Sequence, residues 1–153
     1  MSVPIRAAGA EDAADVAGLL HDFNIEFGDF TPGVEALTAN ARRMLETGEM
    51  TVLLAGQGPD ALAELRFRAS VWSEKLDAYL EELYVAPALR GQGIGRALLD
   101  ATMEEARSRG AGHIDLNTSV DDTAAIALYE SAGFTNCEGN PDGPSMIYYE
   151  REL

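Results

Sequence analysis

Apolar residues recur along this chain at two spacings, and each spacing predicts a different kind of element. In residues 11–27 they return every three or four positions, as Leu19 and Phe23 do, which predicts a helix with one apolar face. The same spacing resumes after the break at residues 31–33 and continues to Gly48. The start of the chain is therefore predicted to form two amphipathic helices.

Beyond Gly48, β-type runs alternate with helical ones. The predicted strands cover residues 3–6, 51–55, 61–69, 78–86, 113–118 and 146–150, and the later helices cover 94–109 and 123–132. The glycine-rich turn 56–60 predicts a hairpin, whereas a right-handed crossover helix should make strands 78–86 and 113–118 parallel. This order predicts a single α/β (α+β) domain over residues 1–153, with a mixed sheet flanked by helices.

The net charge of −15, from 26 acidic and 11 basic side chains, limits the partners of the protein. Sequence-independent binding to nucleic acid needs a basic surface, so no nucleic-acid partner is expected. A strongly acidic surface attracts small cations over long range. It also serves solubility alone, and both interpretations stay open.

Hydropathy and cysteine content predict a cytoplasmic protein. No apolar run approaches the length of a membrane span, and the first residues lack the basic-then-apolar pattern of a signal peptide. Cys137 is the single cysteine, so no intramolecular disulfide or cysteine cluster is expected. His21 and His113 have no partners at metal-ligand spacing, and both are interpreted as structural.

A glycine-rich turn joins strand 78–86 to helix 94–109 and predicts a diphosphate site. Amides at a helix start have no helical carbonyl to bind, and the helix dipole favours an anion there. Glycines let the backbone approach that anion, and Arg90 and Arg96 flank the turn with positive charge. A tight connection without a ligand is the alternative. The sequence lacks the P-loop Gly-Lys-Ser/Thr and the acidic residue of a Rossmann site.

Two motifs carry a resemblance to a known family. The turn reads Arg90-x-x-Gly93-x-Gly95, and a second motif reads Ala125-x-x-Leu128-Tyr129-Glu130-x-x-Gly133-Phe134. Both, in this order and with a strand between them, resemble the GNAT superfamily of N-acetyltransferases. The run Tyr79–Val85 is also similar, more weakly, to the polyamine-type (spermidine/spermine) acetyltransferases.

The resemblance implies a GNAT acyl-CoA N-acyltransferase fold with a splayed mixed sheet, and acetyl-CoA as cosubstrate without a metal. Pantetheine would lie in the splay against residues 83–85, and the pyrophosphate on the amides of 91–96. One departure stands at Asp122, where the family usually carries Asn, because Asp can cap a helix but cannot donate a hydrogen bond. The cofactor contacts implied are Leu83, Tyr84, Val85, Arg90, Gly91, Gln92, Gly93, Ile94, Gly95, Arg96, Asp122 and Ala125.

Acyl transfer to an amine needs a base, because an alkylammonium is protonated at neutral pH. Strand alternation puts Glu81 on one face with Leu83 and Val85, whose apolar character should raise its pKa, and Glu82 on the other face unless a bulge rotates the strand. The resemblance implies that Glu81 is the base and that Glu82 helps to bind the amine. Which of the two is the base stays open.

The resemblance also implies that Tyr129 is the general acid that protonates the departing sulfur. A backbone amide of residues 83–85 is the expected oxyanion donor. Glu26 and Trp72, which are predicted to lie in or beside loops, are candidate contacts of the acceptor.

These observations predict an enzyme that transfers acetyl from acetyl-CoA to a primary amine by direct attack. Its expected acceptor is a small cationic amine. A protein or peptide acceptor is one alternative, and a catalytically silent acyl-CoA sensor or interaction domain is another. Small members of the family are often dimers, which suggests a homodimer, and no membrane partner is expected.

Overall fold

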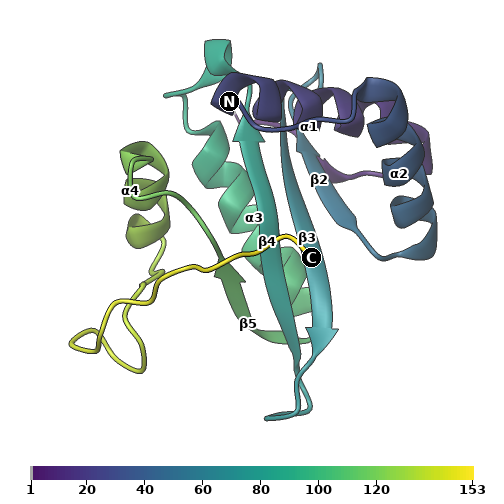
Figure 1. The fold of residues 1–153 in the computed structure, drawn as a ribbon. Coiled ribbons are helices and arrows are strands. Elements are labelled where there is room, and N and C mark those ends of the chain that lie inside the picture. Colours follow the sequence, from purple (N-terminus) through teal and green to yellow (C-terminus); the bar gives the residue numbers. More distant parts are fainter. Residues whose placement is uncertain (1) are drawn as a thin grey trace. The chain divides into compact units, whose positions relative to one another are not determined.

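The computed structural model describes residues 2–153, which form two compact units that divide after Leu116. The first unit holds a five-stranded sheet in the order β1-β2-β3-β4-β5 (Figure 1). Its strands are β1 (Ile5–Ala7), β2 (Thr51–Ala55), β3 (Ala61–Ala69), β4 (Leu76–Val85) and β5 (Ala111–Leu116). Neighbours from β1 to β4 are antiparallel and β4 pairs with β5 in parallel, which confirms the predicted mixed sheet.

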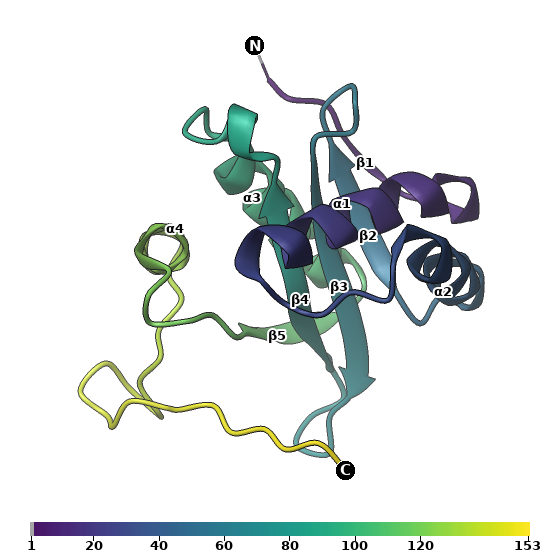
Figure 2. The same ribbon diagram turned by 45° about the horizontal axis from the view of Figure 1, so that its top comes forward.

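Helices cover both faces of this sheet. The elements are a 3-10 turn (Ala10–Asp12), α1 (Ala13–Phe27), α2 (Val34–Thr47), a second 3-10 turn (Pro87–Leu89) and α3 (Ile94–Ser108). Figures 1 and 2 show α1 and α2 on one side and α3, the crossover between the parallel strands, on the other. Val16 and Leu19 of α1 share a buried core with Leu62 and Tyr84. Thus α1 covers the sheet face to which Leu62 and Tyr84 belong.

An ion pair between an exposed arginine and a buried carboxylate joins β1 to the start of α1. The Asp12 carboxylate accepts two hydrogen bonds from Arg6, at 2.8 and 2.9 Å, and a third from the Gly9 amide at 2.8 Å. Hydrogen bonding to Arg6 and then to Gly9 lowers the pKa of Asp12 to about 2. The carboxylate therefore satisfies an amide that precedes the helix and fixes the direction in which the chain enters it.

The second unit begins at Asn117 and contains α4 (Thr123–Ser131). The predicted strand over 146–150 is wrong, because no part of this stretch is in a strand. A β-type run forms a strand only where a neighbour pairs with it and buries one of its faces. Here Tyr148 and Tyr149 are 63% and 83% exposed. The backbone before it instead forms a loop closed by the Met146 amide, which donates to the Asn136 carbonyl at 2.7 Å.

The end of α4 also differs in part from expectation. Gly133 follows the helix with a φ of 93°, as expected of a residue that ends a helix. The predicted helix 123–132 ends one residue earlier, at Ser131, and Phe134 packs edge-on against Tyr129, with 5.8 Å between ring centroids. Among residues 2–153, no helix is both long enough and apolar enough to cross a membrane.

Candidate active site

A β-bulge in β4 gathers three glutamates on one face of the sheet. Leu80 lies opposite Leu65 and Glu82 lies opposite Glu64, so β4 has one extra residue, Glu81, at this point. Leu65 and Glu64 are adjacent on β3 and point to opposite faces, so Leu80 and Glu82 must do the same. Glu82 therefore shares the α1 face with Tyr84 and not with Leu80. Simple alternation would have placed Leu80 and Glu82 together.

Glu64 is the buried member of this group, with 6% of its surface exposed. Burial, followed by repulsion from Glu81 and then Glu82, raises the pKa of Glu64 to about 8. Burial also raises the pKa of Glu82, to about 7, with further contributions from Glu81 and Asp29. Both carboxyl groups therefore titrate near neutral pH, where a side chain can both accept and release a proton.

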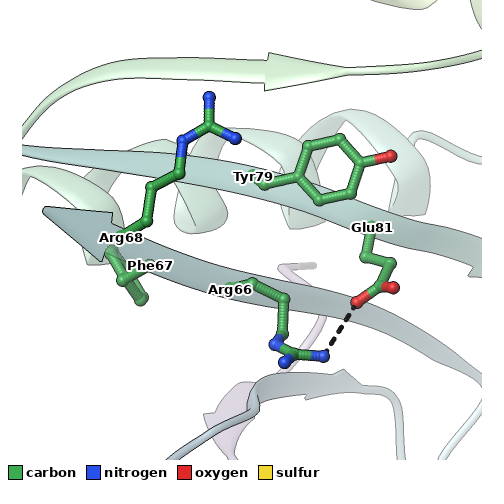
Figure 3. A pocket seen from close by; sticks show the side chains of 5 residues that line it. All are labelled: Arg66, Phe67, Arg68, Tyr79 and Glu81. Carbon is green, nitrogen blue, oxygen red and sulfur yellow. Dashed lines mark hydrogen bonds and ion pairs between the residues drawn. The ribbon is translucent and has the colours of Figure 1, made fainter. Parts of the chain in front are cut away.

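Glu81 lies beside a cation instead of among apolar side chains. Its carboxylate accepts a hydrogen bond from Arg66 of β3 at 3.4 Å, and its side chain is 38% exposed. Figure 3 shows the two side chains pointing toward one another. An open hollow of about 350 Å³ lies over this part of the sheet, lined by Arg66, Phe67, Arg68, Tyr79 and Glu81.

The sheet opens next to the bulge. The paired register between β4 and β5 runs from Leu76 to Leu80 and goes no further, so residues 81–85 have no β5 partner. On their other side, Leu83, Tyr84 and Val85 pair with β3. This arrangement is the splay that the family resemblance implied, and it leaves an edge of β4 to which an extended ligand could hydrogen-bond.

The glycine turn has the backbone geometry of an anion seat. Gly91 and Gly93 have φ values of 78° and 84°, and Gly93 is the residue that precedes α3. The first amides of α3 have no acceptor within the helix, and the helix dipole adds to their positive potential. The main-chain amides of residues 91–96 could therefore hold an anion such as a diphosphate.

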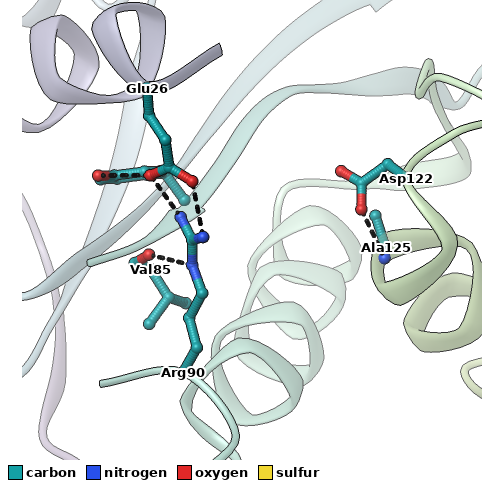
Figure 4. A network of polar contacts seen from close by, with 6 residues as sticks. Glu26, Val85, Arg90, Asp122 and Ala125 are labelled. Atoms are coloured by element: carbon teal, nitrogen blue, oxygen red, sulfur yellow. Dashed lines mark hydrogen bonds and ion pairs between the residues drawn. The ribbon is translucent and has the colours of Figure 1, made fainter. Parts of the chain in front are cut away.

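The arginines that flank this turn are both engaged by carboxylates. Arg90 donates to the two Glu26 carboxylate oxygens at 2.7 and 2.8 Å and to the Val85 carbonyl at 2.9 Å (Figure 4). Arg96 donates to Asp100 at 3.1 Å. Both arginines were expected to offer their charge to phosphate, but each donates to an acidic side chain. An anion at this turn would therefore be bound by main-chain amides more than by guanidinium groups.

Glu26 links the end of α1 to the turn and to β4. Besides Arg90, it accepts a hydrogen bond from the Tyr84 hydroxyl at 3.4 Å, and the Arg90 guanidinium lies 5.5 Å from the centre of the Tyr84 ring. Hydrogen bonding to Arg90 is the main cause that lowers the pKa of Glu26, whereas burial is the main cause that raises that of Tyr84. Glu26, predicted to contact the acceptor, is thus held by the cofactor-side turn.

In the second unit, Asp122 caps α4 as predicted. Its Oδ1 accepts a hydrogen bond from the Ala125 amide at 3.1 Å (Figure 4). This contact uses the acceptor capacity that Asp shares with the family's usual Asn. Tyr129 lies on the same helix and is half-buried.

Other candidates lie apart from the glutamates in sequence or are exposed. Trp72 is 93% exposed in the loop between β3 and β4. His21 has its Nδ1 2.9 Å from the Thr31 hydroxyl, in keeping with a structural role. Cys137 carries a free thiol. Among the described residues, no group of three potential ligands is placed to hold a metal.

Sequence reasoning missed Glu64. It lies within the run Ala61–Ala69, two residues after Leu62, so the two side chains belong to the same face of the strand. The signal that could have found it is an acidic residue at an inward position of a strand, since a buried carboxyl needs a partner. The bulge that brings Glu81 and Glu82 toward it depends on pairing between strands, which alternation along one strand does not encode.

Comparisons with known proteins all point to the same family. The model of the acetyltransferase (GNAT) family matches residues 22–134. An uncharacterized N-acetyltransferase of Bacillus subtilis is 30% identical over 88% of this chain and 91% of its own length. Streptothricin acetyltransferase of Streptomyces lavendulae is 36% identical over 57% of the chain. That match spans 45% of the Streptomyces protein, and matches to mycothiol acetyltransferases span 22% and 24% of theirs.

Solved structures show the same fold. A protein of Arthrobacter sp. FB24, provisionally described as an acetyltransferase, is 46% identical, with a TM-score of 0.90 over 98% of this chain and 96% of its own. An aminoglycoside acetyltransferase from an uncultured soil sample is 25% identical, with a TM-score of 0.78 over 100% and 99% of the two chains. A second one, solved with sisomicin, is 20% identical with a TM-score of 0.79 over 99% and 96%, which shows the fold alone.

Proposed function

Because this chain belongs to the GNAT acetyltransferase family, we propose that it transfers an acetyl group from acetyl-CoA to the primary amine of a small cationic acceptor. The observation that carries the acceptor class is the group of Glu64, Glu81 and Glu82 at the β4 bulge. An ammonium group is attracted to such carboxylates, and the chain's charge of −15 adds long-range attraction.

Glu82 is the better matched base of the two glutamates on β4. A general base works best when its pKa lies near the operating pH, and burial raises the pKa of Glu82 to about 7. Glu81, exposed beside Arg66, is then the group that receives the ammonium. This assignment exchanges the roles that the family resemblance suggested, and it rests on the burial of the Glu82 carboxyl.

The other steps follow from the motifs. Acetyl-CoA is held by the amides of residues 91–96 at its diphosphate and by the open edge of residues 83–85 along its pantetheine. Once Glu82 has taken the proton, the amine nitrogen attacks the acetyl carbonyl carbon, and an amide of residues 83–85 stabilises the oxyanion. The carbon–sulfur bond then breaks, Tyr129 gives its hydroxyl proton to the sulfur, and CoA leaves as the thiol. The nitrogen loses its second proton to solvent, which leaves a neutral amide, and the Tyr129 phenolate takes a proton back from solvent. Asp122 and Ala125 contribute by fixing the start of α4, the helix that carries Tyr129.

The names of the related proteins indicate acceptors of more than one kind. They include streptothricin and mycothiol acetyltransferases and an alanine N-acetyltransferase of ribosomal protein bS18. A peptide amino terminus is therefore the second candidate. The adjacent carboxylates of Glu81 and Glu82 favour the small amine, because two acidic groups side by side attract a compact cation.

The decisive experiment measures CoA thiol release from acetyl-CoA with polyamines, aminoglycosides, amino acids and short peptides. We expect release with one cationic small-molecule class, and a loss of about 10²-fold or more in kcat for Tyr129→Phe with unchanged acetyl-CoA binding. Phe134→Leu, which alters the ring packed on Tyr129 but not its hydroxyl, is the control. Binding of acetyl-CoA without release for any acceptor would support a silent sensor or interaction domain instead.

Location and assembly complete the proposal. We propose that residues 1–153 act as one acetyltransferase domain in the cytoplasm, because the family match at 22–134 covers parts of both compact units. A homodimer is proposed by likeness to small members of the family. Sedimentation at several protein concentrations distinguishes the mass of one chain from that of two.

A further inference from the structure

We propose that Glu64 is a positioning residue for amine acetylation: its carboxylic acid donates a hydrogen bond to Glu81 and holds that carboxylate, together with Arg66, in the orientation that receives the acceptor. This inference rests on the proposed function. It assigns a role on β3 to a residue outside both family motifs.

The position of Glu64 in the sheet supports this role. On one side it pairs with Val52 of β2, which is 1% exposed, and on the other with Glu82 of β4. Val52 belongs to the apolar core under α1, so the carboxyl has an apolar neighbour on its β2 side. Its polar neighbours are therefore on the β4 side, where the bulge supplies Glu81.

The charges around Glu64 favour a carboxylic acid over a carboxylate. The groups that act on it are Glu81 and Glu82 from β4 and Arg66 from its own strand, while Asp29, after α1, acts on Glu82. Arg66 bonds to Glu81 at 3.4 Å, so the single cation of this group is already shared. Burial and the two like charges leave Glu64 protonated at neutral pH, and only the protonated form can donate to Glu81.

The consequence is a hydrogen-bond donor that is lost at alkaline pH. When Glu64 ionises, it stops donating to Glu81 and repels it, so Glu81 turns away from its place between Glu64 and Arg66. A glutamine at this position keeps an N–H donor at every pH. The wild-type enzyme and Glu64→Gln should therefore diverge across the pH range in which Glu64 titrates.

The first test needs no acceptor. Carbon-13 NMR of protein labelled at the glutamate carboxyl carbons, with the Glu64 signal identified by its loss in Glu64→Gln, gives its titration midpoint. We expect a midpoint near 8, and a decrease of about one pH unit or more in Glu81→Gln. Glu104→Gln, on the exposed surface of α3, should leave it unchanged. A midpoint like that of exposed glutamates, or one indifferent to Glu81→Gln, would overturn the proposal.

The second test separates positioning from packing. With the acceptor found in the release assay, the ratio of kcat/KM for Glu64→Gln to that for wild type should rise between pH 7 and 9. Glu64→Leu, which fills the space without a donor, should lose about 10-fold or more in kcat/KM at pH 7 while its acetyl-CoA Kd stays unchanged. A constant ratio, or equal activity of the Leu and Gln variants, would refute positioning. If no acceptor is found, the proposed function fails, and the titration still decides the state of Glu64.

Discussion

At Gly93 the backbone has a φ of 84°, immediately before the first residue of α3. A Cβ there would meet no atom within 4 Å beyond the two neighbouring residues, so there is room for a methyl group. The cost of a substitution is therefore conformational, because residues with a Cβ rarely adopt this left-handed region. Gly93 is therefore needed for the backbone conformation that orients the main-chain amides of the turn.

We predict that Gly93→Ala lowers the free energy of unfolding by about 1–2 kcal/mol and weakens acetyl-CoA binding. The matched control is Gly18→Ala, inside α1, where an added Cβ also meets nothing within 4 Å but the backbone is helical. That change should be neutral or stabilising by up to about 1 kcal/mol. Urea denaturation and calorimetric titration measure both. Equal effects of the two substitutions would show that backbone conformation at Gly93 is not the cause.

At the scale of elements, an ion pair connects the end of α1 to the turn before α3. The two terminal guanidinium nitrogens of Arg90 donate to the two carboxylate oxygens of Glu26, and the side chains of Arg90 and Glu26 are 42% and 28% exposed. Such partly exposed pairs contribute about 0.2–1 kcal/mol. The same guanidinium belongs to the residue immediately before residues 91–96, which are proposed to bind the diphosphate. Glu26 and the diphosphate should therefore compete for Arg90.

This competition predicts that Glu26→Gln tightens acetyl-CoA binding by about 2- to 5-fold, because the charge of Arg90 is no longer neutralised. The control is Glu104→Gln, which removes the partner of Arg107 near the other end of α3 and should leave the Kd unchanged. Calorimetric titration with acetyl-CoA measures both. Weaker binding by Glu26→Gln would mean that the ion pair holds the turn in its binding conformation instead of competing for its charge.

The elements predicted from sequence agree with the structure wherever the pattern is local. The strands 51–55 and 61–69 have the predicted bounds, and α3 differs by one residue at its end. The errors concern pairing between distant segments. Glu81 joins the face of Glu82 because β4 has a bulge at this point, and residues 146–150 have strand propensity without a partner. For the same reason the sequence did not reveal the site position of Glu64 or the pairing of Arg90 with Glu26. Both depend on which side chain lies across the sheet or the turn.

At the scale of the whole molecule, ionisable groups act on stability in opposite directions. Asp12 has its pKa lowered to about 2, so its contribution is present above its ordinary value of 3.8 and is lost as the pH falls toward 2. Glu64 and Glu82 have their pKa values raised, to about 8 and about 7. Their contribution is complete below the ordinary value of 4.5 and is lost as the pH rises through the raised values.

The free energy of unfolding should therefore be highest near pH 4–5 and fall by on the order of 2–4 kcal/mol toward pH 9, because the unfolded chain releases protons that the folded chain retains. Glu64→Gln should remove much of this fall, whereas Glu104→Gln, the same change of charge on the surface, should not. Urea denaturation at pH 5, 7 and 9 measures the free energy of unfolding of each protein. The net charge of −15 adds repulsion that salt screens, while the buried carboxyls are screened much less. A fall that disappears in about 0.5 M salt, or that is the same in Glu64→Gln, would assign it to surface charge and not to the glutamates at the bulge.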